Sequence, residues 1–368
     1  MAIKEITKRL QPEFDFYLLT YRFSASEPRF ELIDGVKVFR LGFGTLFDRL
    51  FLFPLLAFWK GRQLVRREKI SVLWGVMVSY ASIAAYLLRL LNSRLYFFLT
   101  LQEGDSEAHL KFGKAGLLGF WWRRLVKKAD YLQVISTFLG DYAIQQGASK
   151  RIAVIPNGVD IEHFSTPSTS ATLQRYRRFF SLGPEDKVII TVSRLVEKNG
   201  VEVIISALSF LGKNYKLLIL GQGRLEAKLK KIVAEKKLED RVIFVGTVSH
   251  KELPDYLHLA DVFVRPSRSE GLGTAFLEAM AAKVPVIGTA VGGIPDFLRD
   301  RHTGLVVKID DSPGLAEKIK EITTNRELSD KLKERAFKLV QERYSWDQIA
   351  AELGKVLTLP FSSATSKE

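Results

Sequence analysis

The sequence predicts an α/β protein made of two doubly wound domains, each with a parallel sheet covered by helices. Short apolar segments rich in β-branched residues alternate with longer amphipathic segments along most of the chain. Strict alternation of this kind is typical of parallel strands joined by helical crossovers. The alternation is interrupted by the serine- and threonine-rich residues 165–170 and then starts again. The length of 368 residues also fits two domains of about 150 residues each.

The first half of the chain has the elements of one such domain. Ile3, Ile6 and Leu10 define the apolar face of an amphipathic helix, and Pro54 interrupts another helix. The uncharged residues 71–88 reach the lower length limit for a membrane-spanning helix, but their polar residues favour a buried strand followed by a helix. The expected elements are strands over residues 14–20, 71–78, 95–101, 131–135 and 151–155, and helices over residues 1–10, 51–65, 120–128 and directly after residue 78.

The second half repeats this rhythm. Its expected elements are strands over residues 187–193, 216–220, 242–245, 262–264 and 284–288, and helices over residues 200–211, 224–237, 251–258 and 275–282. We expect one domain over residues 1–165, a second over residues 166–343, and a C-terminal helix and tail over residues 344–368 that packs back toward the first domain. Ligands of doubly wound sheets bind at the carboxyl ends of the strands, so we expect the site in a cleft between the two domains.

The charge balance favours anionic partners. The chain has 55 Lys and Arg against 41 Asp and Glu, a formal net charge of +14, which favours nucleic acid, phosphorylated small molecules or an acidic membrane. Nucleic acid is not expected as a partner, because no RNP aromatics, zinc finger or helix-turn-helix is recognisable. The absence of cysteine excludes disulfides and thiolate chemistry. The five histidines have no metal-ligand spacing, so no metal is expected.

Residues 265–280 are the most informative segment, a glycine-containing loop that leads from a strand into a helix. Gly271 and Gly273 allow unusual backbone angles and a close approach of a ligand. The free N–H groups at the start of the helix, at its positive dipole end, suit a phosphate or a hydroxyl-rich ligand. Glu270 precedes the helix and Glu278 lies about one turn inside it, so both carboxylates can face one ligand. The alternative is a solvated loop carboxylate and a second carboxylate on a helix face.

This segment resembles the Glu-x7-Glu motif of the family 4 retaining glycosyltransferases, with Glu270 and Glu278 as the two glutamates. Further segments of the family pattern lie before and after it, so the resemblance covers nearly the whole chain. They are residues 154–160, 162–164, 285–289, 292–296, 304–307 and 344–347. Each segment is weak evidence alone, whereas their order and spacing are specific to the family.

The resemblance implies the GT-B fold, in which two Rossmann-like domains face each other across a cleft. It implies a retaining transfer of a sugar from a nucleotide-diphosphate donor, held by the second domain, to a hydroxyl of a glycan or lipid-linked acceptor, held by the first, without a metal or other cofactor. In this family Glu270 would contact hydroxyls of the donor sugar and Glu278 the ribose, because a carboxylate accepts two hydrogen bonds from a diol. Backbone amides would hold the sugar and phosphate, in the residues Gly271, Leu272, Gly273, Thr274 and Ala275.

A second set of candidate residues follows the strand expected over residues 187–193. Arg194 comes directly after this strand end, and its guanidinium together with the Lys198 ammonium would stabilise a diphosphate leaving group. The alternative is two surface cations near a helix N-terminus, which is an unfavourable place for cations. The resembling family has lysine five residues after the arginine, where this chain has Asn199. Either Lys198 takes that place or Asn199 donates a weaker, neutral hydrogen bond.

Two further segments follow expected strands. Gly221 and Gly223 form a glycine turn that resembles the Gly-x-Gly segment beside the donor in the family, although many α/β proteins have such turns. Val245 and Gly246 align with the loop that reads the nucleotide base in the family. These residues do not identify the base or the sugar.

The first domain departs from the family pattern in two places. Gln102 stands where the family has a histidine, and Glu103 where it has an aspartate. Glutamine can bind a sugar hydroxyl but cannot act as a general base. His109 is expected to be a surface residue rather than a replacement for the histidine. The usual first strand and glycine loop are not found before residues 1–10, so we expect a truncated first domain with an exposed strand edge.

Two basic clusters suggest contact with an anionic membrane. The first cluster is Arg62, Arg66, Arg67 and Lys69, and the second is Arg123, Arg124, Lys127 and Lys128, which follow Phe120, Trp121 and Trp122. Cations beside interfacial tryptophans are typical of a monotopic membrane face, and the alternative is a solvated helix face. We expect a cytoplasmic protein, for which a solvated helix face and peripheral contact with the inner face of the membrane both stay open.

Other functions stay open for this pattern of residues. A truncated, catalytically impaired protein would bind nucleotide sugars without transferring the sugar. An isomerase with the same fold would act on a nucleotide sugar.

Overall fold

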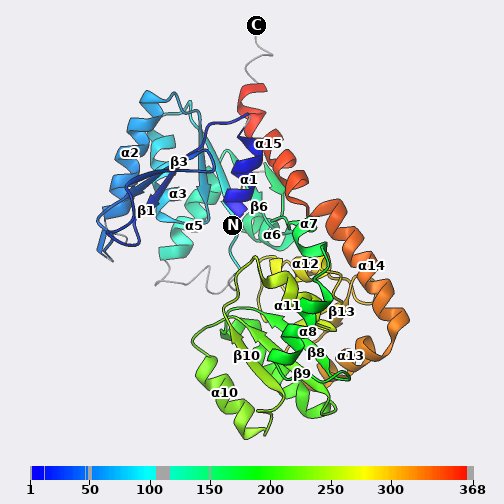
Figure 1. The fold of residues 1–368 in the computed structure, drawn as a ribbon. Coiled ribbons are helices and arrows are strands. Elements are labelled where there is room, and N and C mark those ends of the chain that lie inside the picture. Colours follow the sequence, from blue (N-terminus) through cyan, green and yellow to red (C-terminus); the bar gives the residue numbers. More distant parts are fainter. Residues whose placement is uncertain are drawn as a thin grey trace. The chain divides into compact units, whose positions relative to one another are not determined.

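The computed structural model describes residues 2–11, 13–45, 47–48, 52–104, 117–148 and 151–362. The chain divides into two units (Figure 1). The first unit comprises residues 1–157 and 346–368, and the second unit residues 158–345. Each unit contains a parallel sheet and a hydrophobic core of its own.

The first unit contains two sheets within the described residues. The four-stranded sheet is parallel, with the order β4-β5-β6-β7, and the three-stranded sheet has the order β1-β3-β2. The strands are β1 (Tyr17–Tyr21), β2 (Phe30–Ile33), β3 (Val36–Leu41), β4 (Val72–Val76), β5 (Tyr96–Leu101), β6 (Tyr131–Val134) and β7 (Ile152–Val154). The helices are α1 (Ala2–Leu10), α2 (Phe53–Arg67), α3 (Tyr80–Leu91), α5 (Leu117–Lys128), α6 (Thr137–Gln145) and α15 (Trp346–Ser362). None of the described helices in either unit is both long enough and apolar enough to cross a bilayer.

Strands β2 and β3 form an antiparallel hairpin that the alternation of strands and helices does not predict. Asp34 and Gly35 connect them, with φ angles of 45° and 79°. Two successive residues with positive φ are typical of the tight turns that match the twist of a hairpin, and Asp-Gly is a favoured sequence for them. This dipeptide is the signal in the sequence from which the hairpin follows.

Helix α1 and the C-terminal helix α15 pack against each other within the first unit (Figure 1). Ile6 and Leu10 of α1 belong to the same buried cluster as Ile349 and Leu353 of α15, and the cluster reaches Phe98 of β5. The apolar residues of α15 recur at a helical period, so one face of this helix supplies part of the core of the first unit.

Helices α2, α3 and α5 pack in a row, with α3 in contact with both of the others. Large apolar side chains lie on their outer surfaces, where Trp59 is 63% exposed and Phe120 is 49% exposed. Trp122 is buried, and its ring packs edge-on against Tyr142 with the centroids 4.9 Å apart. The expectation of a tryptophan at the surface is therefore wrong for Trp122, because this residue shares the inner face of α5 with the buried Leu125.

The second unit is built on a six-stranded parallel sheet with the order β10-β9-β8-β11-β12-β13. The strands are β8 (Lys187–Val192), β9 (Tyr215–Leu220), β10 (Val242–Gly246), β11 (Val262–Arg265), β12 (Val286–Thr289) and β13 (Leu305–Val307). The chain proceeds from β8 toward β10 on one side and then returns to place β11 on the other side of β8. The strand order therefore reverses between β8 and β11, and ligands of such sheets bind outside the carboxyl ends of the strands at this point.

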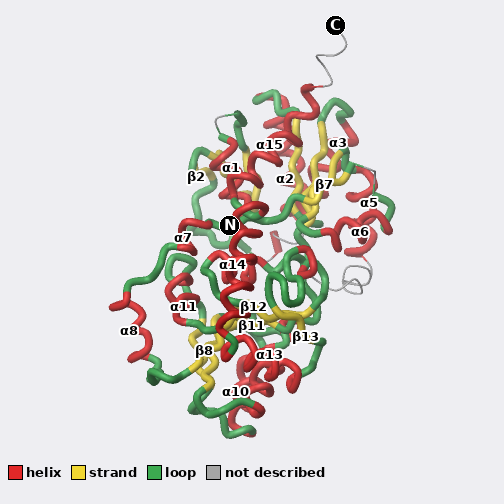
Figure 2. Tube along the Cα trace, turned by 90° about the vertical axis from the view of Figure 1, so that its right-hand side faces the viewer, coloured by secondary structure: helices red, strands yellow, loops and turns green. Residues whose placement is uncertain are grey.

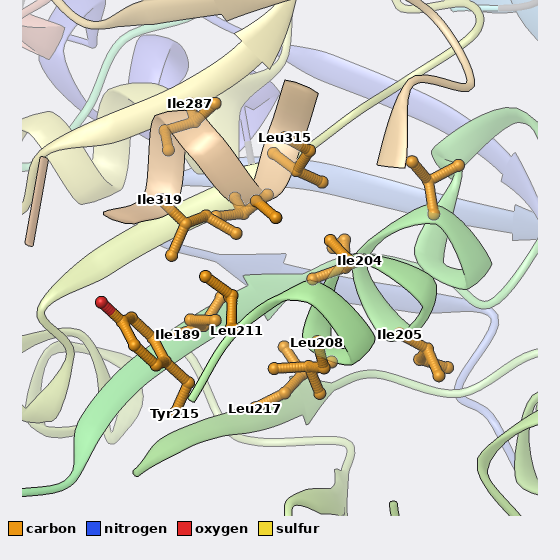
Figure 3. Close-up of a cluster of buried hydrophobic side chains, with 14 of the residues drawn as sticks. Ile189, Ile204, Ile205, Leu208, Leu211, Tyr215, Leu217, Ile287, Leu315 and Ile319 are labelled. Atoms are coloured by element: carbon orange, nitrogen blue, oxygen red, sulfur yellow. The ribbon is translucent and has the colours of Figure 1, made fainter. Parts of the chain in front are cut away.

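Helices cover both faces of this sheet (Figure 2). Right-handed crossovers place α9 and α10 on one face, where α13 also packs against α9, and place α11 and α12 on the other. Figure 3 shows Ile204 and Leu208 of α9, Leu315 and Ile319 of α13, and Leu217 of β9 in the core between α9, α13 and the sheet. The helices and turns are α7 (Ile161–Ser165), α8 (Ser170–Phe179), η2 (Glu197–Asn199), α9 (Val201–Ala207), η3 (Leu208–Phe210), α10 (Glu226–Glu235), α11 (Leu253–Leu259), α12 (Thr274–Ala281), η4 (Ile294–Asp296), α13 (Ser312–Thr324) and α14 (Arg326–Arg343).

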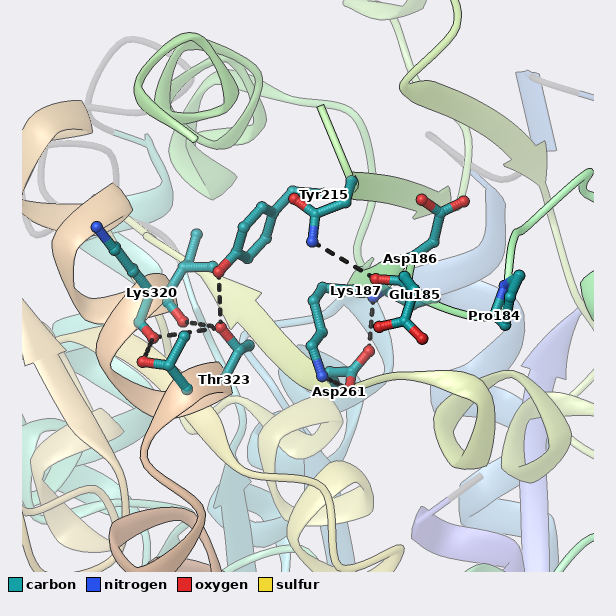
Figure 4. Close-up of polar contacts among 12 residues, drawn as sticks. Pro184, Glu185, Asp186, Lys187, Tyr215, Asp261, Lys320 and Thr323 are labelled. Atoms are coloured by element: carbon teal, nitrogen blue, oxygen red, sulfur yellow. Dashed lines mark hydrogen bonds and ion pairs between the residues drawn. The ribbon is translucent and has the colours of Figure 1, made fainter. Parts of the chain in front are cut away.

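The amino ends of the central strands are closed by contacts within the protein (Figure 4). The Asp261 carboxylate accepts a hydrogen bond of 2.7 Å from the Val188 N–H and lies 3.7 Å from the Lys187 Nζ. The Tyr215 hydroxyl lies 3.1 Å from the Thr323 hydroxyl of α13. These polar groups at the amino edge are therefore already paired with each other.

Candidate functional site

The loop that carries Arg194 leaves the carboxyl end of β8 and is held by the next loop of the sheet. The Ser193 N–H donates to the Leu220 carbonyl, and the Leu195 N–H donates to the Gln222 carbonyl, both at 3.0 Å. Gly221 has a φ of 124°, and a Cβ atom there would collide with the Ser193 carbonyl oxygen. Glycine is therefore required at this position so that the two loops can pack. A contact between this glycine turn, which includes Gly223, and a donor stays a prediction.

Arg194 is an exposed cation, and its side chain makes no hydrogen bond or ion pair with any residue that the structure describes. The neighbouring arginines are already paired. Arg224 donates to the Glu197 carboxylate, and this bond lowers the pKa of Glu197. Arg268 pairs with Asp310 at 2.6 Å, and the hydrogen bond to this carboxylate raises the pKa of Arg268. Arg194 is thus available to an anionic ligand at the carboxyl end of β8.

Asn199 is buried and its amide is occupied by the protein. Its Nδ2 donates to the Arg194 carbonyl at 2.6 Å, and its Oδ1 accepts from the Arg265 Nη2 at 3.1 Å. A hydrogen bond from Asn199 to a donor would therefore have to come from the second hydrogen on its Nδ2. Lys198 is half-buried in the same turn, and its carbonyl accepts from the Arg268 N–H at 2.7 Å. The role of these two residues toward a diphosphate stays a prediction.

Glu270 is fixed by its neighbours through both its side chain and its peptide. Its carboxylate pairs with Arg265, and the two side chains are only 11% and 12% exposed. Its carbonyl accepts from the Gly293 N–H at 3.1 Å. Gly292 has a φ of 54°, and a Cβ atom there would collide with the Glu270 carbonyl oxygen. The turn at 292–293 therefore holds the Glu270 backbone in place, and Arg265 holds its carboxylate.

Helix α12 begins next to Glu270 with an open N-terminus. Gly273 is the N-cap residue, with a φ of 94°, and no side chain caps the helix. A Cβ atom on Gly273 would lie 3.4 Å from the Glu270 Cγ, which places the helix start beside this side chain. Thr274 and Ala275 follow and are half-buried, whereas Gly271 and Leu272 are buried. The first N–H groups of α12 lack intrahelical partners and face the region that an anion would favour.

Glu278 is 9% exposed and is held by a histidine that the sequence did not identify. Its Oε1 lies 3.3 Å from the His250 Nε2. The His250 ring stacks on His163 with the centroids 5.5 Å apart, and the His163 Nε2 lies 3.0 Å from the His250 carbonyl oxygen. His250 comes four residues after Gly246 at the end of β10, so the loop expected to read the base also orients Glu278.

Replacing His250 by alanine is expected to raise the KM for the donor about tenfold and to change kcat by less than about threefold. The reason is that Glu278 would lose the polar contact with the His250 ring that holds it, and the ribose that it is expected to bind is remote from the reacting bond. His250→Gln, which keeps a donor, should restore most of the affinity. The measurement is steady-state kinetics with varied donor. His302, which is exposed in the same unit, gives the matched control as His302→Ala, and an unchanged donor KM for His250→Ala would contradict the role.

Buried polar atoms without a partner among the described residues gather at the carboxyl halves of β8 and β11. They are the Thr191 Oγ1, Ser193 Oγ, Arg265 Nε and Ser267 Oγ. Buried polar groups in folded proteins are nearly always hydrogen-bonded to protein, water or ligand. The two strands are neighbours on either side of the reversal of strand order, so this edge of the sheet is where a polar ligand or ordered water is expected.

In the first unit, Gln102 and Glu103 follow β5 and have separate environments. The Gln102 Nε2 donates to the Asn157 Oδ1 at 3.3 Å. The Glu103 carboxylate is buried and accepts from the Val78 N–H at 2.8 Å, just before α3, so this residue supports the start of the helix. His109 lies outside the described residues.

A groove of about 500 Å³ lies between α7, the segment before α8, and α11, and none of the predicted donor residues lines it. The Ser168 hydroxyl lies 2.9 Å from the His258 Nδ1, and the His258 Nε2 lies 3.0 Å from the Phe164 carbonyl oxygen. Burial lowers the pKa of His258. These bonds fasten the segment after α7 to α11 and leave the groove without an assigned role. Within the described ranges, no group of three His, Asp or Glu side chains is placed to hold a metal ion.

Residues of both units match models of known protein families. Residues 2–158 match the family described as glycosyl transferase 4-like domain, and residues 174–339 match glycosyl transferases group 1. A GDP-mannose-dependent α-(1-6)-phosphatidylinositol monomannoside mannosyltransferase of Mycobacterium tuberculosis is 32% identical over 247 residues, which are 64% of this chain and 63% of the relative. An uncharacterized glycosyltransferase of Methanocaldococcus jannaschii is 26% identical over 97% of this chain and 93% of its own length. This chain therefore matches less than two thirds of the mycobacterial protein.

Two solved structures have the same fold at low sequence identity. Sucrose-phosphate synthase from Thermosynechococcus elongatus superposes with a TM-score of 0.85 at 22% identity, over 98% of this chain and 93% of that one. Anabaena HepE, solved in complex with UDP and glucose, superposes with a TM-score of 0.77 at 17% identity, over 97% and 95%. At these identities the likeness establishes the fold.

Proposed function

Since this chain belongs to the group 1, or family 4, glycosyltransferases and has their GT-B fold, we propose that it transfers a sugar, with retention, from a nucleotide-diphosphate sugar to a hydroxyl of a glycan or lipid-linked acceptor. The observation that carries the proposal is the carboxyl edge of the second sheet. Arg194, whose side chain has no partner among the described residues, lies at this edge together with the fixed Glu270 and the open start of α12. A cation, a carboxylate and free N–H groups are the chemistry that a diphosphate joined to a sugar requires.

In the proposed reaction the bond between the anomeric carbon and the diphosphate oxygen breaks. The acceptor oxygen bonds to the same face of the anomeric carbon, and its proton passes to the leaving phosphate oxygen. The Arg194 guanidinium and the Lys198 ammonium offset the charge that grows on the diphosphate. We assign Gln102 to the acceptor; a glutamine side chain cannot take the proton, which agrees with a route in which the phosphate is the base.

We infer the remaining donor contacts from the family resemblance. Glu270 orients the hydroxyls of the donor sugar, Glu278 binds the ribose, and the backbone of residues 271–275 holds the sugar and phosphate. Val245 and Gly246 contact the base. The mycobacterial relative is named for a GDP-mannose donor and a lipid-linked acceptor, and HepE was solved with UDP, so both nucleotides belong in the test.

The test is incubation of the protein with GDP-mannose or UDP-glucose and a panel of glycan and lipid-linked acceptors, followed by NMR of the product. Transfer with the α configuration of the donor conserved is the expected result. Tight donor binding without turnover would instead favour a nucleotide-sugar-binding protein, and conversion of the nucleotide sugar without any acceptor would favour an isomerase. Cationic side chains, rather than a metal ion, are proposed to stabilise the charge on the diphosphate. The rate is therefore expected to be the same with and without EDTA.

We also propose a lipid-facing surface on the first unit, formed by the outer sides of α2 and α5. Trp59 of α2 is exposed, and the Arg62 guanidinium lies 5.9 Å from its ring centroid. Phe120 of α5 is exposed in the same manner, and the Arg124 guanidinium lies 5.0 Å from its ring centroid. Aromatic side chains beside cations are typical of surfaces that bind anionic lipid headgroups. A lipid-linked acceptor at the inner face of a membrane would be reached from such a surface.

Liposome co-sedimentation tests this surface. Vesicles with phosphatidylglycerol are expected to bind the protein in low salt and to release it as salt rises. Each basic residue near an anionic membrane contributes about 1 kcal/mol of attraction, and this attraction weakens because the Debye length becomes shorter as salt is added. Trp59→Ser with Arg66→Gln and Arg67→Gln should reduce binding at least about fivefold. Lys230→Gln with Lys231→Gln on α10 of the second unit is the control. Equal sedimentation of wild type and triple variant would contradict the surface.

A further inference from the structure

Arg265 is a nearly buried cation at the carboxyl end of β11. Its side chain is 12% exposed. Its Nη2 contacts two residues that are predicted to bind the donor, the Asn199 Oδ1 at 3.1 Å and the Glu270 carboxylate. Residue 199 lies 66 positions before Arg265 in the sequence, and β8 and β11 are neighbours in the sheet. One guanidinium therefore joins the two halves of the candidate donor site.

The position of this charge matters because Asn199 stands where the resembling family has a lysine. An amide carries no charge, and both ends of the Asn199 amide are bonded within the protein. Arg224 and Arg268 are paired with Glu197 and with Asp310. Arg265 thus brings a positive charge to the Asn199 side chain from a different strand.

The buried ion pair between Arg265 and Glu270 is not explained by a contribution to folding stability. Its Nε is buried without a partner among the described residues, as is the nearby Ser267 Oγ. A buried ion pair rarely adds net stability, because the desolvation of both charges opposes their attraction. Breaking such a pair is costly, however, since one charge is then left buried. The Arg265 guanidinium does, however, hold the Glu270 carboxylate in one orientation.

We propose that Arg265 is the positioning residue of the donor site: its guanidinium, anchored on Asn199, fixes the Glu270 carboxylate toward the donor sugar. This inference rests on the proposed function, because it assigns Glu270 to the sugar. Arg265 acts through Glu270 and Asn199, while Arg194 remains the cation that meets the diphosphate.

The proposal makes a specific distinction between ligands. A nucleoside diphosphate lacks the sugar, so its affinity should not depend on Glu270 or on Arg265. A nucleotide sugar should lose affinity and reactivity together when Glu270 is no longer oriented. A general loss of structure would weaken both ligands equally.

The experiment compares wild type with Arg265→Gln, Arg265→Lys and the double variant Asn199→Lys/Arg265→Gln. Titration calorimetry with GDP, UDP, GDP-mannose and UDP-glucose gives the affinities, and donor turnover gives kcat. For Arg265→Gln we expect an affinity for the nucleotide sugar about tenfold lower, a kcat about 100-fold lower because the reacting group is misplaced, and an affinity for GDP or UDP within about twofold of wild type. In the double variant a lysine at position 199 can reach the Glu270 carboxylate, so kcat should recover at least about tenfold.

Each other outcome has a defined meaning. Wild-type protein that neither binds nor turns over any donor contradicts the proposed function itself. If wild type is active, a kcat of Arg265→Gln equal to that of wild type overturns the positioning role. An equal loss of affinity for GDP and GDP-mannose in this variant also overturns it, because Arg265 would then act on the diphosphate or on the fold. If Arg265→Gln does not fold, Arg265→Lys, which keeps the charge, is used instead to test whether residue 265 positions Glu270. A kcat for Arg265→Lys above that of Arg265→Gln/Glu270→Gln by at least about tenfold supports the proposal, and equal rates contradict it.

Discussion

Replacing Glu270 by glutamine is expected to lower kcat/KM for the donor by two to three orders of magnitude, on the order of what a lost polar contact at a reacting centre costs. Glutamine keeps a side chain of the same shape beside Arg265 but loses the charge that pairs with Arg265 and orients two sugar hydroxyls. Alanine is the less informative change, because it leaves the Arg265 guanidinium buried and unpaired, at a cost of about 3–5 kcal/mol in folding free energy. The measurement is donor turnover together with thermal unfolding.

Glu226→Gln gives the matched control for this change. Glu226 lies on α10 and pairs with Lys230 at 2.7 Å on the surface, so the same chemical change there should leave kcat/KM unaltered. Full activity of the Glu270→Gln variant would remove Glu270 from the site. A melting temperature lowered by many degrees, with activity lost in proportion, would show that Glu270 matters to the fold rather than to the donor.

Replacing Arg194 by alanine is expected to lower kcat about 100-fold or more, because the growing charge on the diphosphate loses its guanidinium partner and keeps only the Lys198 ammonium of the two proposed cations. Its neighbours Arg224 and Arg268 are paired with carboxylates. The folding free energy should change little, since the exposed Arg194 side chain makes no ion pair with the described residues. Release of nucleoside diphosphate, followed over time, measures the effect.

Arg194→Lys separates charge from geometry. Lysine keeps one positive charge but not the planar fork that binds two phosphate oxygens, so an intermediate rate is expected. Arg224→Ala is the control, because this exposed arginine pairs with Glu197 in the adjoining turn. An Arg194→Ala variant with the wild-type rate would show that the diphosphate lies elsewhere.

Much of the fold follows from periodicity in the sequence. The strand expected over residues 262–264 is present as β11, and the helix expected over 275–282 is present as α12, one residue earlier at each end. The helix expected over residues 200–211 ends as α9 at Ala207 and continues as the 3-10 turn η3. The alternation of strands and helices does not predict the hairpin at Asp34 and Gly35, because its two strands have no helix between them.

The candidate site was only partly predictable, for a physical reason. Arg194, Glu270 and Glu278 each follow a strand or begin a helix, and that local context marks them. Arg265 and His250 do not differ from ordinary strand-end and loop residues in the sequence. Their roles depend on contacts with Asn199, Glu270 and Glu278 that only the folded sheet creates.

Titration calorimetry with GDP-mannose and UDP-glucose tests most directly whether the carboxyl edge of β8 and β11 is a nucleotide-sugar site. We expect wild-type protein to bind at least one of them with a Kd between about 1 μM and 1 mM, and the variant Arg194→Ala/Glu270→Gln to bind the same ligand at least about 100-fold more weakly. Equal affinity of the two proteins would contradict the account.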